Sequence, residues 1–303
     1  MAATRAATRP SGVRIWLMAA RVRTLPAAIA PVLVGTALAG YLHVFHPLRF
    51  AAALIGAMFI QIGTNLSNDY SDARRGADTE DRLGPVRVTA GGLVPPRQVL
   101  IATYLTFGVA VLAGVYLVVV AGWQLLLVGA ASILAGVLYT GGPKPYGYEG
   151  LGELFVFLFF GIVAVAGSYF VQVKHLDWEA FALAVPVGLL AAAILVVNNF
   201  RDIDSDRRAG KRTLAVRLGR GGTRALFATI VYLAFVLAPV TWVFGPTKAW
   251  VLLPWLTVVF AAGVVRVVRN STDGPSLNEA LAHTGMLQLA FCVLLSAGLL
   301  LSG

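Results

Sequence analysis

Charged residues are scarce in this sequence. Lys, Arg, Asp and Glu together make up 13% of the 303 residues, whereas soluble domains carry about 25%. Cysteine is also scarce, because Cys292 is the only one in the chain, and this excludes an internal disulfide and a cysteine-based metal site. The hydrophobic share of 58% therefore indicates a membrane protein and argues against a soluble enzyme.

The apolar residues form long runs that contain no Asp, Glu, Lys or Arg. Eight such runs cover residues 24–48, 50–68, 98–143, 154–173, 180–200, 225–247, 249–265 and 280–303. A transmembrane helix needs about 20 residues, and the third run would form a helix of roughly 69 Å, more than twice the roughly 30 Å hydrocarbon layer. This run must turn, and we place the turn at Ala121 and Gly122. The sequence thus predicts an all-α protein with nine transmembrane helices.

Basic residues fall mainly on one side of this predicted topology. With the N-terminus in the cytoplasm, 21 of the 24 Lys and Arg residues lie on the cytoplasmic side, and the outer segments hold Arg49, Lys174 and Lys248. This asymmetry follows the positive-inside rule. It accounts for the net charge of +10 without a nucleic-acid partner, and it predicts a multi-pass protein of the inner cell membrane.

Acidic residues are rarer still, and most of them gather in two segments. Eight of the 14 Asp and Glu residues lie in residues 65–81 and 198–212, which continue from the cytoplasmic ends of two predicted helices. Helical periodicity places polar side chains of each segment on one face. The two faces comprise Asn65, Asn68, Asp69 and Asp72 in the first segment, and Asn198, Asp202 and Asp206 in the second.

Such clusters of carboxylate and amide oxygens suit a bound cation. Like charges one helical turn apart repel each other, and a cation between them removes the repulsion. Oxygen donors without Cys or His favour Mg²⁺ or Ca²⁺, and Mg²⁺ usually takes one or two protein carboxylates and completes its shell with phosphates and water. The pattern predicts a Mg²⁺-diphosphate site, although solvated helix ends and a cation-coupled transporter remain alternatives.

The two segments also repeat. Asp206 follows Asp72 by 134 residues, and Asp202 follows Asn68 by the same interval. We interpret this as a parallel repeat of two four-helix units, at about residues 24–140 and 151–268, with a ninth helix at about 280–301. A single domain is expected over residues 13–303, after a disordered tail of residues 1–12.

A third polar segment lies on the same predicted side, between Tyr139 and Glu153. Its glycine and proline content predicts a loop. Lys144 in this loop could pair with a phosphate or could simply be an interfacial lysine.

The two acidic motifs carry a family resemblance. Asn68-Asp69-x-x-Asp72 and Asp202-x-x-x-Asp206 resemble the aspartate motifs of the UbiA superfamily of intramembrane prenyltransferases. Residues 68–87, 141–153 and 198–219 are similar to the 1,4-dihydroxy-2-naphthoate polyprenyltransferases within it. Asp78 follows Asp72 by six residues, which is similar to this branch, whereas many relatives, such as the 4-hydroxybenzoate enzymes, have a spacing of four.

The resemblance implies a fold, a reaction and a set of site residues. It implies a nine-helix bundle in which Mg²⁺ bridges the diphosphate of a polyprenyl diphosphate to both motifs, at a site that opens to the cytoplasmic side. The acceptor would be 1,4-dihydroxy-2-naphthoate, with loss of CO₂, or alternatively another ring such as 4-hydroxybenzoate. The implied catalytic residues are Asp69, Asp72, Asp202 and Asp206, and the implied metal ligands are Asn68, Asp72, Asp202 and Asp206. The implied diphosphate-binding residues are Arg87, Lys144, Lys211 and Arg217, and the further candidates are Asn65, Asp78, Tyr139 and Asn198.

The general base is left open by the sequence. Asp69 or Asp204 could accept a phenolic proton. Asp204, however, lies about 160° from Asp202 on an ideal helix, so it could instead pair only with an arginine. Prenyl chain length and oligomeric state are likewise not set by the sequence.

Overall fold

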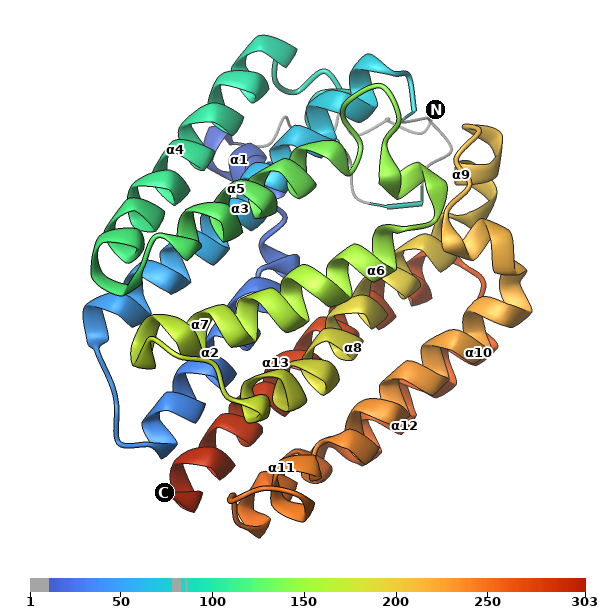
Figure 1. Ribbon diagram of the computed structural model, residues 1–303. Coiled ribbons are helices and arrows are strands. Elements are labelled where there is room, and N and C mark those ends of the chain that lie inside the picture. The colour runs from blue at the N-terminus through green and yellow to red at the C-terminus, as the bar shows by residue number, and fades with distance from the viewer. Residues whose placement is uncertain (1–10, 78–82, 85–86) are drawn as a thin grey trace, which may run out of the picture.

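The computed structural model describes residues 11–77, 83–84 and 87–303. The regular structure of these residues is entirely helical (Figure 1), which confirms the predicted all-α class. The helices are α1 (Gly12–Ala20), η1 (Val22–Thr24), α2 (Pro26–Tyr41), α3 (Pro47–Arg74), α4 (Pro96–Ala121), α5 (Gln124–Leu138), η2 (Tyr146–Glu149), α6 (Gly152–Val156), η3 (Phe157–Val163), α7 (Ala164–Val173), α8 (Trp178–Arg201), α9 (Ile203–Arg208), α10 (Leu214–Leu237), α11 (Val240–Val243), η4 (Ala249–Thr257), α12 (Val258–Asn270) and α13 (Gly274–Ser302).

Two sequence expectations fall partly outside this description. Residues 1–10 of the predicted tail are not described, while Ser11 caps α1 by accepting a hydrogen bond from the backbone N–H of Arg14. Asp78 also lies outside the described residues.

The predicted count of nine membrane spans is not confirmed. Seven helical segments of the described chain are long and apolar enough to cross a membrane, and an eighth is obtained if α1 with η1 and α2, which meet at a bend of 50°, form one span. Helix α5 is apolar but has only 15 residues, a length of roughly 22 Å against a hydrocarbon layer of roughly 30 Å. A short helix can satisfy its backbone hydrogen bonds inside a protein bundle without crossing the whole bilayer.

The long apolar run at residues 98–143 turns where the sequence predicts. Helix α4 ends at Ala121, and Gly122 adopts a φ of 140° before α5 begins at Gln124. A side chain is strained in this region of backbone conformation, whereas glycine adopts it readily.

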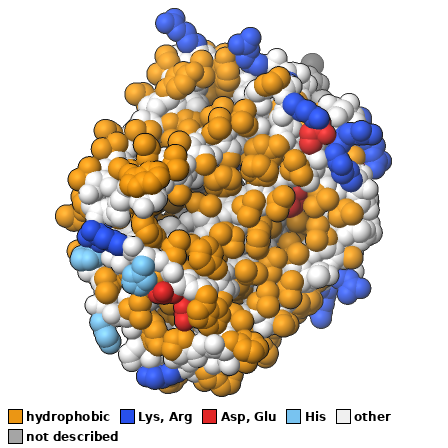
Figure 2. Space-filling view, in the orientation of Figure 1, with side chains coloured by type: hydrophobic (Ala, Val, Ile, Leu, Met, Phe, Trp, Pro, Cys, Tyr) orange, Lys and Arg blue, Asp and Glu red, His pale blue; other side chains and the backbone are white. Residues whose placement is uncertain are grey.

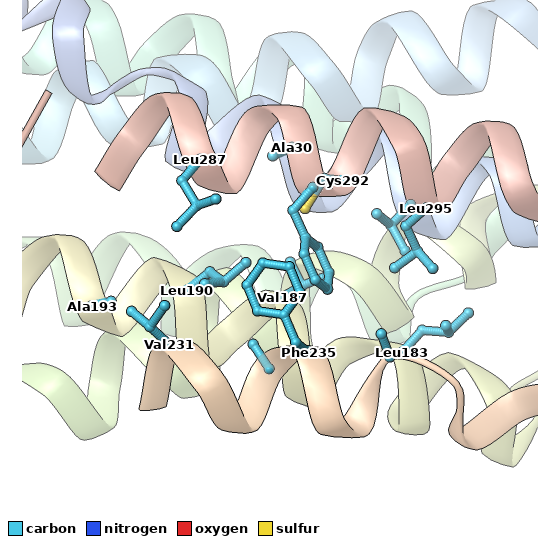
Figure 3. Close-up of a cluster of buried hydrophobic side chains, with 14 of the residues drawn as sticks. Ala30, Leu183, Val187, Leu190, Ala193, Val231, Phe235, Leu287, Cys292 and Leu295 are labelled. Atoms are coloured by element: carbon cyan, nitrogen blue, oxygen red, sulfur yellow. The ribbon is translucent and has the colours of Figure 1, made fainter. Parts of the chain in front are cut away.

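The apolar core lies among α2, α8, α10 and α13. Figure 3 shows Leu183, Val187 and Leu190 of α8 facing Leu287 and Leu295 of α13. Of an apolar 18-residue stretch of α8, 72% of the residues are buried, whereas the corresponding stretch of α4 has 22% buried. Helix α8 is therefore a central element, and α4 is peripheral. Hydrophobic side chains also cover most of the face in Figure 2, with Lys and Arg side chains at its margins, as expected of a surface in contact with lipid.

A π-helical segment, η3, lies between α6 and α7 and packs closely against α8. A Cβ atom added at Gly161 would lie 2.6 Å from the Cα atom of Gly188, and one added at Gly188 would lie 2.9 Å from the carbonyl oxygen of Phe157. The absence of both side chains permits this close contact. Wide turns of this kind occur often at functional sites, and residues of this one line the cavity described below.

Candidate active site

A cavity of about 560 Å³ lies between the helices. Its polar lining comes from the C-terminal ends of α3 and α8, where Asn68, Asp72 and Asn198 face it. Its apolar lining includes Val115 and Val118 of the second half of α4. The cavity therefore joins a polar region to an apolar one. Further lining residues are Ala110, Leu125, Val128, Phe155, Phe159 and Phe160.

Two residues of the first motif, Asn68 and Asp72, lie on the face of α3 that is turned toward this cavity. Asp72 is only 2% exposed. Its Oδ2 accepts a hydrogen bond from Arg87 at 3.0 Å, and its Oδ1 accepts one from the hydroxyl of Tyr148 at 2.5 Å. Asn68 accepts a hydrogen bond from Thr140 at 3.0 Å. These bonds orient both side chains of the motif.

Asn65 and Asp69 are held by other contacts. The side-chain amide of Asn65 lines the cavity and donates to the carbonyl oxygen of Ala20 at 3.0 Å. Asp69 instead accepts hydrogen bonds from the backbone N–H groups of Val88, at 3.1 Å, and Thr89, at 2.9 Å. Asp69 does not line the cavity, and it anchors the segment that carries Arg87.

The second motif lies at a break between two helices. Helix α8 ends at Arg201 and α9 begins at Ile203, so Asp202 occupies the junction. Arg201 donates to both carboxylate oxygens of Asp202, at 2.8 and 2.6 Å. Asp204 points elsewhere, because it is 56% exposed and its Oδ2 lies 2.6 Å from Arg220. Of the two options for Asp204, the structure therefore supports a pair with an arginine.

A lysine and a tyrosine connect the two motifs. Lys211 Nζ lies 3.8 Å from Asp206 Oδ1 and 4.8 Å from the ring centroid of Tyr148. The hydroxyl of the same tyrosine donates to Asp72. Asp72, Asp202 and Asp206 line one cavity together with Arg87 and Lys211. Residues 134 positions apart in the sequence thus meet at one site.

Two of the basic residues expected at this site are not there. Lys144 is exposed and does not line the cavity. The side chain of Arg217 is 51% exposed and lies 3.6 Å from Glu149, and it is likewise absent from the cavity wall. Tyr139 and Asn198, in contrast, do line it.

Several polar residues at or beside this site were missed by sequence reasoning. Tyr148, Glu153, Asn199 and Arg201 all make side-chain contacts at or beside the two motifs. Tyr148 and Glu153 belong to the third polar segment, whose position against the motifs the sequence does not reveal. Asn199 and Arg201 directly flank motif residues, and their polarity in an apolar helix was a usable signal.

Two tyrosines of the loop after α5 stay protonated near neutral pH. Burial raises the pKa of Tyr139, and the nearby carboxylate of Glu153 adds to this effect. Burial also raises the pKa of Tyr146, whose hydroxyl donates to the carbonyl oxygen of Ala135 at 2.9 Å. Both residues line the cavity, where the hydroxyl of Tyr139 can serve as a hydrogen-bond donor.

The donor set suits a hard cation that shares its ligands with a phosphate. Among the described residues, no group of three or more His, Cys, Asp or Glu side chains is arranged to hold a metal ion alone. Four residues with oxygen-bearing side chains, Asn68, Asp72, Asp202 and Asp206, line the cavity. Mg²⁺ is typically held by one or two carboxylates together with substrate phosphates, so these residues fit a metal that arrives with a diphosphate.

Comparison with known proteins identifies the family. Residues 28–300 match the UbiA prenyltransferase family. The chain belongs to the UbiA prenyltransferase family. The resemblance predicted from the two aspartate motifs is thereby confirmed, and an aromatic prenyltransferase is favoured over a transporter.

Curated UbiA relatives match the chain over nearly its whole length. The 1,4-dihydroxy-2-naphthoate octaprenyltransferase of Mycobacterium tuberculosis is 42% identical over 94% of this chain and 96% of its own. The protein of the same name from Escherichia coli is 38% identical over 96% of this chain and 97% of its own.

Solved UbiA structures share the fold. A UbiA homolog from Archaeoglobus fulgidus bound to DMAPP and Mg²⁺ has a TM-score of 0.66 at 11% identity, covering 93% of this chain and 99% of that one. The apo UbiA homolog from Aeropyrum pernix K1 has a TM-score of 0.64 at 16% identity, covering 92% and 96%. The helical candidate spans and the family together indicate a multi-pass membrane protein.

Proposed function

We propose that this UbiA family member transfers a polyprenyl group from a polyprenyl diphosphate to 1,4-dihydroxy-2-naphthoate, releasing diphosphate and CO₂. The product would be demethylmenaquinol, an intermediate of menaquinone biosynthesis. The observation that carries the proposal is a single cavity in which residues of both acidic motifs and three basic residues, Arg21, Arg87 and Lys211, adjoin an apolar wall. The names of relatives 38% and 42% identical to the chain support the choice of acceptor.

The polar region would bind the diphosphate. Mg²⁺, which a related structure binds together with DMAPP, would act as a Lewis acid when bound by Asn68, Asp72, Asp202 and Asp206. Arg87 and Lys211 would face the negative charge that grows on the diphosphate as the allylic C–O bond breaks. Charge that is oriented before the reaction stabilises such a transition state without the cost of reorganising solvent.

The apolar wall would hold the prenyl chain and exclude water. Valines of α4 and phenylalanines such as Phe159 line this region. They offer no nucleophile to an allylic cation. The new carbon–carbon bond forms to the electron-rich ring, and the carboxylate leaves as CO₂ while its bonding electrons return to the ring. Exclusion of water favours this outcome over hydrolysis.

The proposed orientation places the polar region at the cytoplasmic face of the inner membrane. Its support is the asymmetry of the basic residues, 21 of 24 on one side of the predicted topology. In this orientation a soluble naphthoate enters from the cytoplasm, and the polyprenyl tail remains in the bilayer.

A two-acceptor assay tests the proposal. The purified full chain in detergent receives Mg²⁺, radiolabelled polyprenyl diphosphate and either 1,4-dihydroxy-2-naphthoate or 4-hydroxybenzoate, with EDTA controls. We expect metal-dependent, decarboxylated lipid product from the naphthoate alone. Product from 4-hydroxybenzoate alone would contradict the acceptor, and no product from either ring would contradict prenyl transfer to these acceptors.

A further inference from the structure

Glu153 is an acidic residue buried in the apolar bundle at the first turn of α6. It is 7% exposed. Its Oε1 accepts a hydrogen bond from Asn199 Nδ2 at 2.9 Å, and among the described residues its Oε2 has no hydrogen-bond partner. Burial of a carboxylate is unfavourable unless the group is paired. Glu153 does not line the cavity, so a role in the site would be exerted through its neighbours.

The neighbours form a chain of hydrogen bonds with one fixed direction. Arginine can only donate hydrogen bonds, so the side chain of Arg201 requires an oxygen from Asn198, which it meets at 3.0 Å. The Nδ2 of Asn198 must then point away from Arg201, and it donates to Asn199 Oδ1 at 3.4 Å. The Nδ2 of Asn199 in turn faces Glu153.

The same guanidinium is fixed on its other sides as well. Arg201 is 3% exposed, donates to both oxygens of Asp202, and donates to Asn278 Oδ1 at 2.8 Å. Asn278 Nδ2 donates to the carbonyl oxygen of Leu83 at 2.9 Å. The carboxylate of Glu153 is therefore the terminal acceptor of a continuous chain that ends, at its other side, on a residue of the second acidic motif.

We propose that Glu153 is a positioning residue that, through Asn199 and Asn198, fixes the guanidinium of Arg201 and thereby the carboxylate of Asp202. This inference rests on the proposed function, in which Asp202 binds the Mg²⁺-diphosphate. Groups that orient metal ligands from behind commonly contribute about 10- to 100-fold to metal affinity or activity. Loss of this positioning should weaken binding of the diphosphate and leave binding of the acceptor ring unchanged.

Because each hydrogen bond in this series has a fixed donor and acceptor, substitutions that preserve side-chain size can test it. Asn199→Asp replaces the donor that faces Glu153, so two carboxyl groups would meet across a distance of 2.9 Å, and their contact would hold only if one of them took up a proton. Glu153→Gln keeps an oxygen for Asn199 to donate to. In the double variant, the Gln side chain can donate to the Asp side chain, whose second oxygen still accepts from Asn198. The double variant thus restores both the series of hydrogen bonds and the net charge.

The experiment compares wild type, both single variants, the double variant and a control, Glu279→Gln. Glu279 is a carboxylate whose side chain is 72% exposed and whose contact is His283 at 3.9 Å. For each protein, calorimetric titration gives the Mg²⁺-dependent dissociation constant of a prenyl thiolodiphosphate, an analogue that resists ionisation. Steady-state assays give KM for each substrate, and a melting curve reports folding.

We expect Asn199→Asp to weaken binding of the analogue about 10- to 100-fold, with the KM for the naphthoate unchanged. Glu153→Gln should stay within about threefold of wild type, and the double variant should recover at least about tenfold over Asn199→Asp. A double variant no better than Asn199→Asp, or Glu153→Gln as impaired as Asn199→Asp, would overturn the inference. Inactive wild type that still binds the analogue would instead count against the proposed acceptor, because the titration tests the positioning role without turnover.

Discussion

Tyr148→Phe is the most informative single substitution at the candidate site. It removes the hydroxyl that donates to Asp72 Oδ1 at 2.5 Å and keeps the ring that Lys211 faces at 4.8 Å. Because Asp72 is 2% exposed, little water can replace the lost donor. The substitution therefore tests whether the orientation of one buried carboxylate controls the site.

The expected magnitude follows from the type of hydrogen bond. A hydrogen bond to a charged group contributes about 1.5–3 kcal/mol, and about 1.4 kcal/mol corresponds to a factor of ten. We therefore expect kcat/KM for polyprenyl diphosphate to fall by a factor of about 10 to about 100, with the ring KM little changed.

The assay follows prenyl transfer at varied polyprenyl diphosphate, with Tyr70→Phe as the matched control. Tyr70 lies on α3, the helix of Asp72, its hydroxyl accepts a hydrogen bond from Arg74 at 3.1 Å, and it does not line the cavity. A fall of less than twofold for Tyr148→Phe, or equal losses in both variants, would refute the reasoning.

Three further predictions follow from the contacts around the site. Asp204→Asn should keep near-wild-type transfer activity, because Asp204 pairs with Arg220 and is 56% exposed; a loss above tenfold would return it to the list of candidate bases. Lys211→Ala should lower kcat/KM at least about tenfold, as loss of a charged contact to a phosphate does, whereas exposed Lys144→Ala should not; the reverse order in the same assay would contradict the placement of the two lysines. Gly188→Ala should destabilise the bundle by about 1–3 kcal/mol, because its added Cβ would lie 2.9 Å from the Phe157 carbonyl oxygen; an unchanged melting temperature would contradict that contact.

Much of the helical architecture could be predicted from the sequence, because lipid imposes a simple rule on it. Backbone groups in hydrocarbon must be paired within the segment, so apolar runs become helices. A run too long for one span must turn, and Gly122 was its best site for a turn. The count of spans could not be predicted, because run length does not reveal that α5 has 15 residues or that α2 meets the preceding helix at 50°.

The candidate site was predictable only in part, because contacts between different helices depend on tertiary packing. Helical periodicity placed Asn68 and Asp72 on one face, and both line the cavity. The same periodicity included Asp69, but the backbone N–H groups of Val88 and Thr89 bind that carboxylate. The contact between Glu153 and Asn199 joins α6 to α8 and depends on packing, which no local pattern encodes.

The measurement that tests the account most directly is the binding of a prenyl thiolodiphosphate to Asp72→Asn and Asp206→Asn, with and without Mg²⁺. The two residues come from motifs 134 positions apart and line one cavity. If both motifs hold one Mg²⁺-diphosphate, each substitution alone removes most of the Mg²⁺-dependent affinity and the prenyl transfer, while the melting curve stays near that of wild type. Wild-type affinity and transfer in either folded variant would contradict a shared site.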